Sequence, residues 1–128
     1  MRPSLQFSVL CDDAAKTSDG KPVFWGAFET IRSAEFPAVH ARMFIVNRWT
    51  AGVGNHTEHT RLISPDGSDP IAVTPATSFS LADRSAAHTV TARIDGLPLT
   101  RAGTYWIQVY ADDELALEYP LNVMKAKA

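Results

Sequence analysis

The chain has few of the features that mark a specialised class of protein. Its single cysteine, Cys11, cannot form a disulfide within the chain, and no apolar run approaches the ~20 residues of a transmembrane helix. Lysine and arginine form no cluster and the net charge is −2, so the basic footprint of a nucleic-acid-binding protein is absent. We therefore expect no nucleic-acid partner and no membrane insertion. The first residues also have no apolar signal-peptide core, and with the lone cysteine this predicts a cytoplasmic protein of bacterial style.

The residues that are present favour one small all-β domain. The 128 residues are 45% hydrophobic and 20% charged, which suffices for a single domain with its own core. Alternating apolar and polar segments, separated by turn residues, recur at 5–12, 23–31, 39–50, 55–64, 71–73, 78–81, 88–94, 105–110 and 114–123. This spacing predicts a single β-sandwich over 1–128 with seven to nine mostly antiparallel strands, immunoglobulin-like or jelly-roll-like. We expect residues 124–128 to form a frayed tail.

The alternation also assigns a core. On each clearly alternating strand every second residue is apolar, and these apolar side chains are expected to face the other sheet. The predicted core residues are Leu5, Phe7, Val9, Val90, Ile94, Tyr105, Ile107, Val109, Leu115, Leu117 and Leu121.

A short motif before the strand at 105–110 resembles part of an immunoglobulin-like domain. The sequence RAGTY at 101–105 is similar to the tyrosine corner, in which a strand-initial tyrosine bonds its hydroxyl to upstream backbone. Cys11 and Trp25 resemble the first cysteine and the core tryptophan of antibody domains, although Ile107 stands where the second cysteine would be. The resemblance implies the Tyr105 hydrogen bond but no disulfide.

A second resemblance covers almost the whole chain. The segments FSVLCDD (7–13), GAFETI (26–31), FPAVH (36–40) and DGLPL (95–99), with the closing hairpin, resemble a family of small uncharacterised bacterial β-sandwich proteins, a domain of unknown function. This resemblance supports the fold class. It implies no catalytic residue.

The residues that could carry chemistry do not form a recognisable catalytic set. His56 and His59 are three apart on one strand, so their side chains are predicted to point to opposite faces. Cys11 shares the parity of the apolar residues before it and is predicted to be a buried structural thiol. The pairs Asp12–Asp13 and Asp112–Asp113 read as solvated turn residues. We expect no catalytic residue, cofactor or metal ligand, and a thiol- or metal-dependent enzyme built on Cys11 and the histidines is kept as an alternative.

Two strand faces are candidates for binding. If Tyr105, Ile107 and Val109 face the core, then Trp106, Gln108 and Tyr110 face outward, an arrangement that suits a sugar or a partner protein.

The strand at 39–50 is apolar on both faces. On one of them Arg42 and Arg48 flank Phe44 and Val46, which suggests a self-association strand. The main hypothesis is a non-catalytic interaction module that binds a protein partner or its own copy as a homodimer. The alternative is a carbohydrate- or small-ligand-binding domain that uses the exposed aromatic residues.

Overall fold

The computed structural model describes residues 2–67 and 70–127, and these residues form ten strands and no helix. The prediction of an all-β sandwich is confirmed, with one strand more than the expected range. The strands are β1 (Ser4–Lys16), β2 (Pro22–Ala27), β3 (Thr30–Ser33), β4 (Ala38–Thr50), β5 (Gly54–Ile63), β6 (Pro70–Val73), β7 (Thr77–Leu81), β8 (Ala87–Leu99), β9 (Gly103–Ala111) and β10 (Glu114–Lys125).

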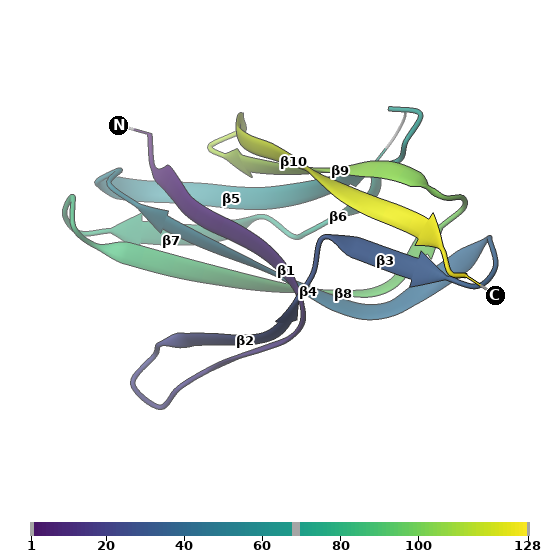
Figure 1. Ribbon diagram of the computed structural model, residues 1–128. Helices are drawn as coiled ribbons and strands as arrows, with labels where there is room; N and C mark the ends of the chain where they lie inside the picture. The colour runs from purple at the N-terminus through teal and green to yellow at the C-terminus, as the bar shows by residue number, and fades with distance from the viewer. Residues whose placement is uncertain (1, 68–69, 128) are drawn as a thin grey trace.

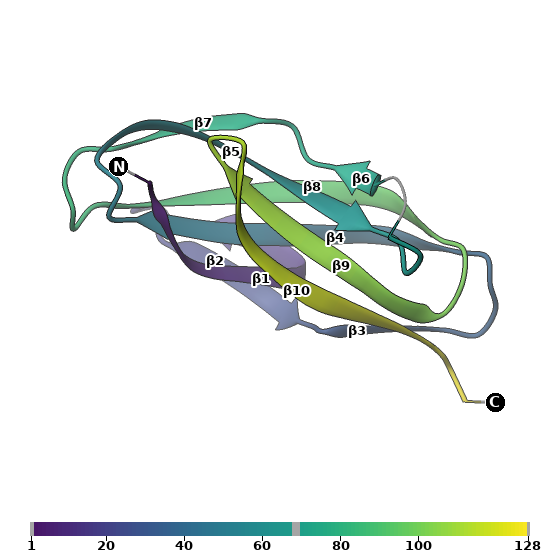
Figure 2. The same cartoon turned by 90° about the horizontal axis from the view of Figure 1, so that it is seen from above.

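The strands divide between two stacked sheets (Figure 1). The first has the order β2-β1-β4-β8 and is antiparallel throughout the described ladders. The second has the order β3-β10-β9-β5-β6, with β7 also paired to β5, and its β3–β10 ladder is parallel. In Figure 2, β9 and β10 lie nearest the viewer, with β4 and β8 behind them.

The core lies between the two sheets. From β4 it receives Met43, Ile45 and Trp49, and from β9 it receives Tyr105, Ile107 and Val109, each almost completely buried. These odd-numbered residues share one face of each strand, as the alternation predicts. The core tryptophan is therefore Trp49. The suggested role of Trp25 is wrong, because its side chain is 55% exposed.

Two β-bulges change which residues reach this core. A register shift between Leu5 and Phe7 leaves Leu5 opposite Trp49 but places Phe7 opposite Arg48, so Phe7 and Val9 lie half-buried on the outer face of the first sheet. A bulge adds one residue to a strand, which reverses the faces of the residues that follow.

The second bulge lies in β10. A shift between Leu115 and Leu117 pairs Leu115 with Tyr110 and Leu117 with Val109. The core assignment of both leucines is wrong, because Leu115 is 47% and Leu117 40% exposed. Beyond the bulge, Leu121 is buried as predicted.

The outer face of the first sheet is covered by the chain itself. β1 bends, and its second half with β2 forms an arm (residues 12–27) that folds below β4 and β8 (Figure 1). The Phe24 ring lies 6.1 Å from the Phe7 ring, measured between centroids. Under this arm Val46 is 1% exposed and Cys11 is fully buried. Strand β4 is apolar on both faces because it packs against a layer on each side.

Two local expectations concern the end of the chain and the tyrosine motif. The Tyr105 hydroxyl donates to the Arg101 carbonyl oxygen at 2.8 Å, so the implied hydrogen bond is present. The tail is less frayed than expected, since β10 continues to Lys125 and the Ala126 amide donates to the Ser33 carbonyl at 2.8 Å. Residue 128 of the expected tail lies outside the described residues.

Candidate functional site

The strand considered for self-association is engaged within the chain. The Arg48 guanidinium donates to Gln6 Oε1 at 3.1 Å and to Thr89 Oγ1 at 2.8 Å. Arg42 lies 3.7 Å from an oxygen of Asp13 and 5.7 Å from the centre of the Phe44 ring. With Val46 buried beneath the arm, the four residues considered for self-association offer a second copy the exposed Arg42 and the half-buried Phe44 and Arg48.

The outward residues of β9 form the centre of a broader surface, which we call the aromatic face. β5 and β10 flank β9, and cross-strand pairs add their side chains: His59 lies opposite Tyr110, and Glu118 lies opposite Gln108. The view in Figure 2 shows β9 and β10 with no other element over them. The aromatic face comprises His59, Arg61, Trp106, Gln108, Tyr110 and Glu118.

Contacts between neighbours fix the side chains of this face. The His59 and Tyr110 rings stack with centroids 4.8 Å apart and an interplanar angle of 3°, and the Arg61 guanidinium lies 5.6 Å from the Tyr110 ring centre. The Tyr110 hydroxyl donates to Gln108 Oε1 at 3.0 Å, and Gln108 Nε2 donates to Glu118 Oε2 at 2.8 Å. Trp106 keeps 38% of its surface exposed. Its outward placement, with Gln108 and Tyr110, is as the alternation predicts.

A buried polar cluster inside the sandwich is the main feature that the sequence reasoning missed. Glu58 is 1% exposed, and its Oε1 accepts hydrogen bonds from Asn47 Nδ2 at 3.1 Å and Trp49 Nε1 at 3.3 Å. Asn47 Nδ2 also donates to Thr60 Oγ1 at 3.1 Å. Burial raises the pKa of Glu58 because the charged carboxylate loses its hydration, and the hydrogen bonds from Asn47 and Trp49 offset only part of this effect. The alternation of β4 and β5 could have indicated this cluster, because Asn47 and Glu58 occupy positions whose side chains point into the sandwich.

His56 and His59 occupy separate environments, whereas His56 and His88 both contact the Phe79 ring. His56 faces the interior and His59 the aromatic face, as their spacing predicts. Around His56, Nδ1 lies 2.7 Å from Asp112 Oδ2 and Nε2 lies 2.6 Å from the Gly52 carbonyl oxygen. Both partners are acceptors, so both bonds form together only when both ring nitrogens carry hydrogen. The hydrogen bond from His56 lowers the pKa of Asp112.

The remaining chemical candidates are similarly occupied or buried. Burial, and secondarily the charge of Asp12, raises the pKa of the Cys11 thiol, which opposes formation of a reactive thiolate. Cys11 Sγ lies 3.8 Å from the Phe44 carbonyl oxygen, the acceptor of a weak hydrogen bond. Among the described residues no group of three His, Cys, Asp or Glu side chains is arranged to hold a metal ion.

Comparison with known proteins places the chain in a family. The profile described as "Family of unknown function (DUF6941)" matches residues 6–124. The chain belongs to this family. This family agrees with the resemblance seen over almost the whole sequence. It has no assigned activity, so the roles of individual residues are inferred from the contacts described above.

Comparison with other proteins adds information on the fold alone. One similar solved structure is the Pseudomonas fluorescens alkylpurine DNA glycosylase AlkC bound to DNA containing an abasic site analog, with a TM-score of 0.55 and 10% sequence identity. The likeness covers 75% of this chain and 28% of that one. No curated protein matches the sequence. None of the described residues belongs to a helix long and apolar enough to span a membrane.

Proposed function

We propose that the protein is a non-catalytic binding module whose aromatic face contacts a partner protein. The observation that carries the proposal is that the uncovered Trp106 shares one face with Tyr110 and Arg61, because these three residue types dominate the energetics of protein interfaces. Next to Trp106, hydrogen bonds and a ring stack hold Gln108, Tyr110 and His59 in place before binding. A fixed face loses less conformational entropy on association than a mobile one.

The groups that could perform acid, base or nucleophilic chemistry support a binding role. Glu58 is sealed in the core and bonded to Asn47 and Trp49, and both ring nitrogens of His56 have partners. The Cys11 thiol is buried and its pKa is raised. The single buried cysteine also supports a cytoplasmic setting, where thiols stay reduced.

The test compares three variants as bait in affinity capture, followed by reconstitution with the purified partner. We expect Trp106→Ala and Arg61→Ala each to weaken binding at least tenfold. Trp25→Ala, which removes the equally aromatic but more exposed Trp25 from the arm, is the matched control and should leave the affinity unchanged. A partner that binds wild type and Trp106→Ala equally well would contradict the proposal.

A carbohydrate remains the second candidate for the same face, because Trp106 offers a ring for stacking while Gln108 and Glu118 offer hydrogen-bonding groups beside it. A glycan array separates the two. Saturable glycan binding that disappears in Trp106→Ala, with no protein partner dependent on Trp106, would replace the protein proposal.

Sedimentation of the wild type over a concentration series identifies the partner as a second copy if a dimer forms and Trp106→Ala dissociates it.

A further inference from the structure

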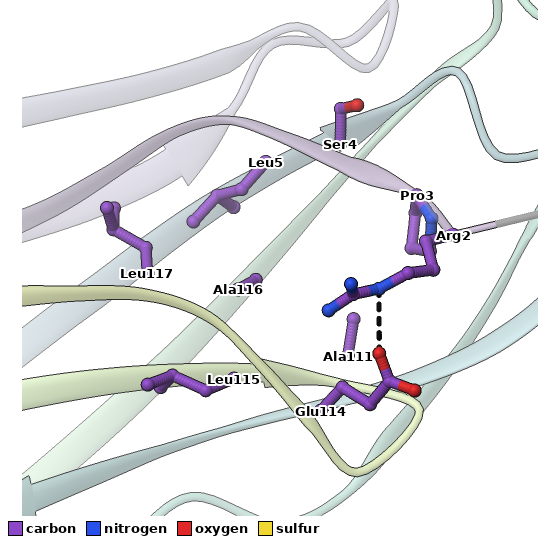
Figure 3. Close-up of a pocket in the computed structure, with 9 residues that line it drawn as sticks. All are labelled: Arg2, Pro3, Ser4, Leu5, Ala111, Glu114, Leu115, Ala116 and Leu117. Carbon is purple, nitrogen blue, oxygen red and sulfur yellow. Dashed lines mark ion pairs between the residues drawn. The ribbon is translucent and has the colours of Figure 1, made fainter.

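A groove runs between the two sheets on the side where β1 and β10 lie. It has a volume of about 490 Å³. Figure 3 shows its lining: Leu5 on β1 and Leu117 on β10 point toward one another, and Ala116 and Leu115 continue the wall along β10. We call this groove the seam. The two leucines of β10 that lie outside the core are thus part of its wall.

Both walls of the seam are strand edges. On β1 the ladder with β4 starts at Ser4, but the ladder with β2 starts only at Cys11. On β10 the ladder with β9 starts at Glu114, but the ladder with β3 starts only at Asn122. In the described ladders the edges of residues 4–9 and 114–121 that face away from β4 and β9 therefore have no strand partner, and at Leu10 the backbone carbonyl accepts from the Phe28 amide at 2.9 Å. Such an edge presents backbone N–H and C=O groups at alternate residues.

Two side-chain contacts mark the ends of the seam. At one end Arg2 Nε lies 2.8 Å from Glu114 Oε2, across the groove in Figure 3. At the other end Ser8 Oγ and the Tyr119 hydroxyl lie 2.8 Å apart and join the two strands. The open stretch on β10 is therefore residues 115–118, enough for about four residues of an extended chain at ~3.3 Å each.

The chemistry of the walls specifies the occupant. The backbone groups of a strand edge are matched by another extended backbone, and the exposed Leu117 beside Leu5 is matched by an apolar side chain. The adjoining turn carries the exposed residues Asp113 and Glu114, and Arg2 is the one basic side chain among the described residues that line the seam, so a further basic residue suits that end.

We propose that the seam is a second binding site, which takes an extended segment of a partner polypeptide by strand addition to the β10 edge. The segment has an apolar residue over Leu5 and Leu117, lacks proline at the positions that bond to β10, and carries a lysine or arginine next to Glu114. This site is separate from the aromatic face and does not depend on the function proposed for that face.

The probe is a phage-displayed library of random dodecapeptides, selected on the wild-type protein and followed by synthesis of the best binder. We expect selected sequences with alternating apolar residues and a basic residue. Leu117→Asp should weaken binding of the synthetic peptide at least tenfold. Val73→Asp, a matched change at an exposed apolar residue of β6, should have less than a twofold effect. Equal urea unfolding of both variants shows that each is folded.

Two further measurements test the mode and the polarity of binding. A peptide methylated on alternate backbone nitrogens loses N–H donors and should bind at least tenfold more weakly. Glu114→Lys should reverse the preference from a lysine-containing to a glutamate-containing peptide. Trp106→Ala should leave peptide affinity unchanged, which separates this site from the aromatic face. No enriched peptide, equal binding of the methylated peptide, or binding indifferent to Leu117→Asp would overturn the proposal.

Discussion

The buried carboxyl of Glu58 makes the stability of this protein depend on pH in a predictable direction. An unfolded glutamate loses its proton near pH ~4.3, whereas burial raises the pKa of Glu58 in the folded protein. Between these two values the folded state holds a proton that the unfolded state has lost. The free energy of unfolding therefore falls as the pH rises through this window, by about 1.4 kcal/mol per unit of pKa difference, and then levels off.

Glu58→Gln removes this dependence while keeping an oxygen that accepts from Asn47 and Trp49. We expect the variant to be more stable than wild type at pH 7, by about 1.4 kcal/mol for each unit of the upward pKa shift, and equal or less stable near pH 4. Urea unfolding of both proteins at several pH values between 4 and 8 measures the difference. Glu35→Gln, a change at an exposed carboxyl, is the control and should follow wild type. If the curves for wild type and Glu58→Gln run parallel over this range, Glu58 is ionised in the folded protein and the reasoning is wrong.

Three further predictions follow from other contacts. Asp112→Asn should lower the free energy of unfolding at pH 7 by about 1–2 kcal/mol, because the charge-assisted bond to His56 is lost at a half-exposed site. Because the pKa of Asp112 is lowered on folding, this difference should shrink as the pH falls below the unfolded value of ~3.9; urea unfolding should show a smaller difference at pH 3 than at pH 7, and an equal difference would contradict the reasoning. Tyr105→Phe should cost about 1 kcal/mol through loss of the bond to the Arg101 carbonyl, measured by urea unfolding; an unchanged midpoint would mean that this bond is not stabilising. Val46→Ala should cost about 1–2 kcal/mol in the stability of the monomer, because its side chain packs beneath the arm; a change in sedimentation without a change in stability would place Val46 at a subunit contact instead.

Sequence alternation predicted the strands well where the ladder is regular. The residues of β9 alternate without interruption, so the inward Tyr105, Ile107 and Val109 and the outward Trp106 were assigned correctly. The failures at Leu115 and Phe7 follow from bulges, which reverse parity without a clear mark in the sequence.

The binding surfaces differ in how far the sequence could predict them. The aromatic residues of β9 were identified from parity alone, but their partners His59 and Arg61 come from β5, and strand order cannot be read from alternation. The seam depends on which strand edges lie next to each other, so a single sequence contains no direct signal for it. The doubly apolar strand β4 was recognised, while its cover proved to be the arm of the same chain.

The arm has a consequence for the order of folding events. β1 and β2 are close in sequence, so their hairpin can form early, but the surface that it covers exists only after β4 has paired with β1. Burial of Val46 beneath the arm therefore requires two ladders to be in place first. Interactions that form after the transition state affect the unfolding rate more than the folding rate. We therefore expect the arm to close late in folding, so that contacts beneath it slow unfolding more than they speed folding.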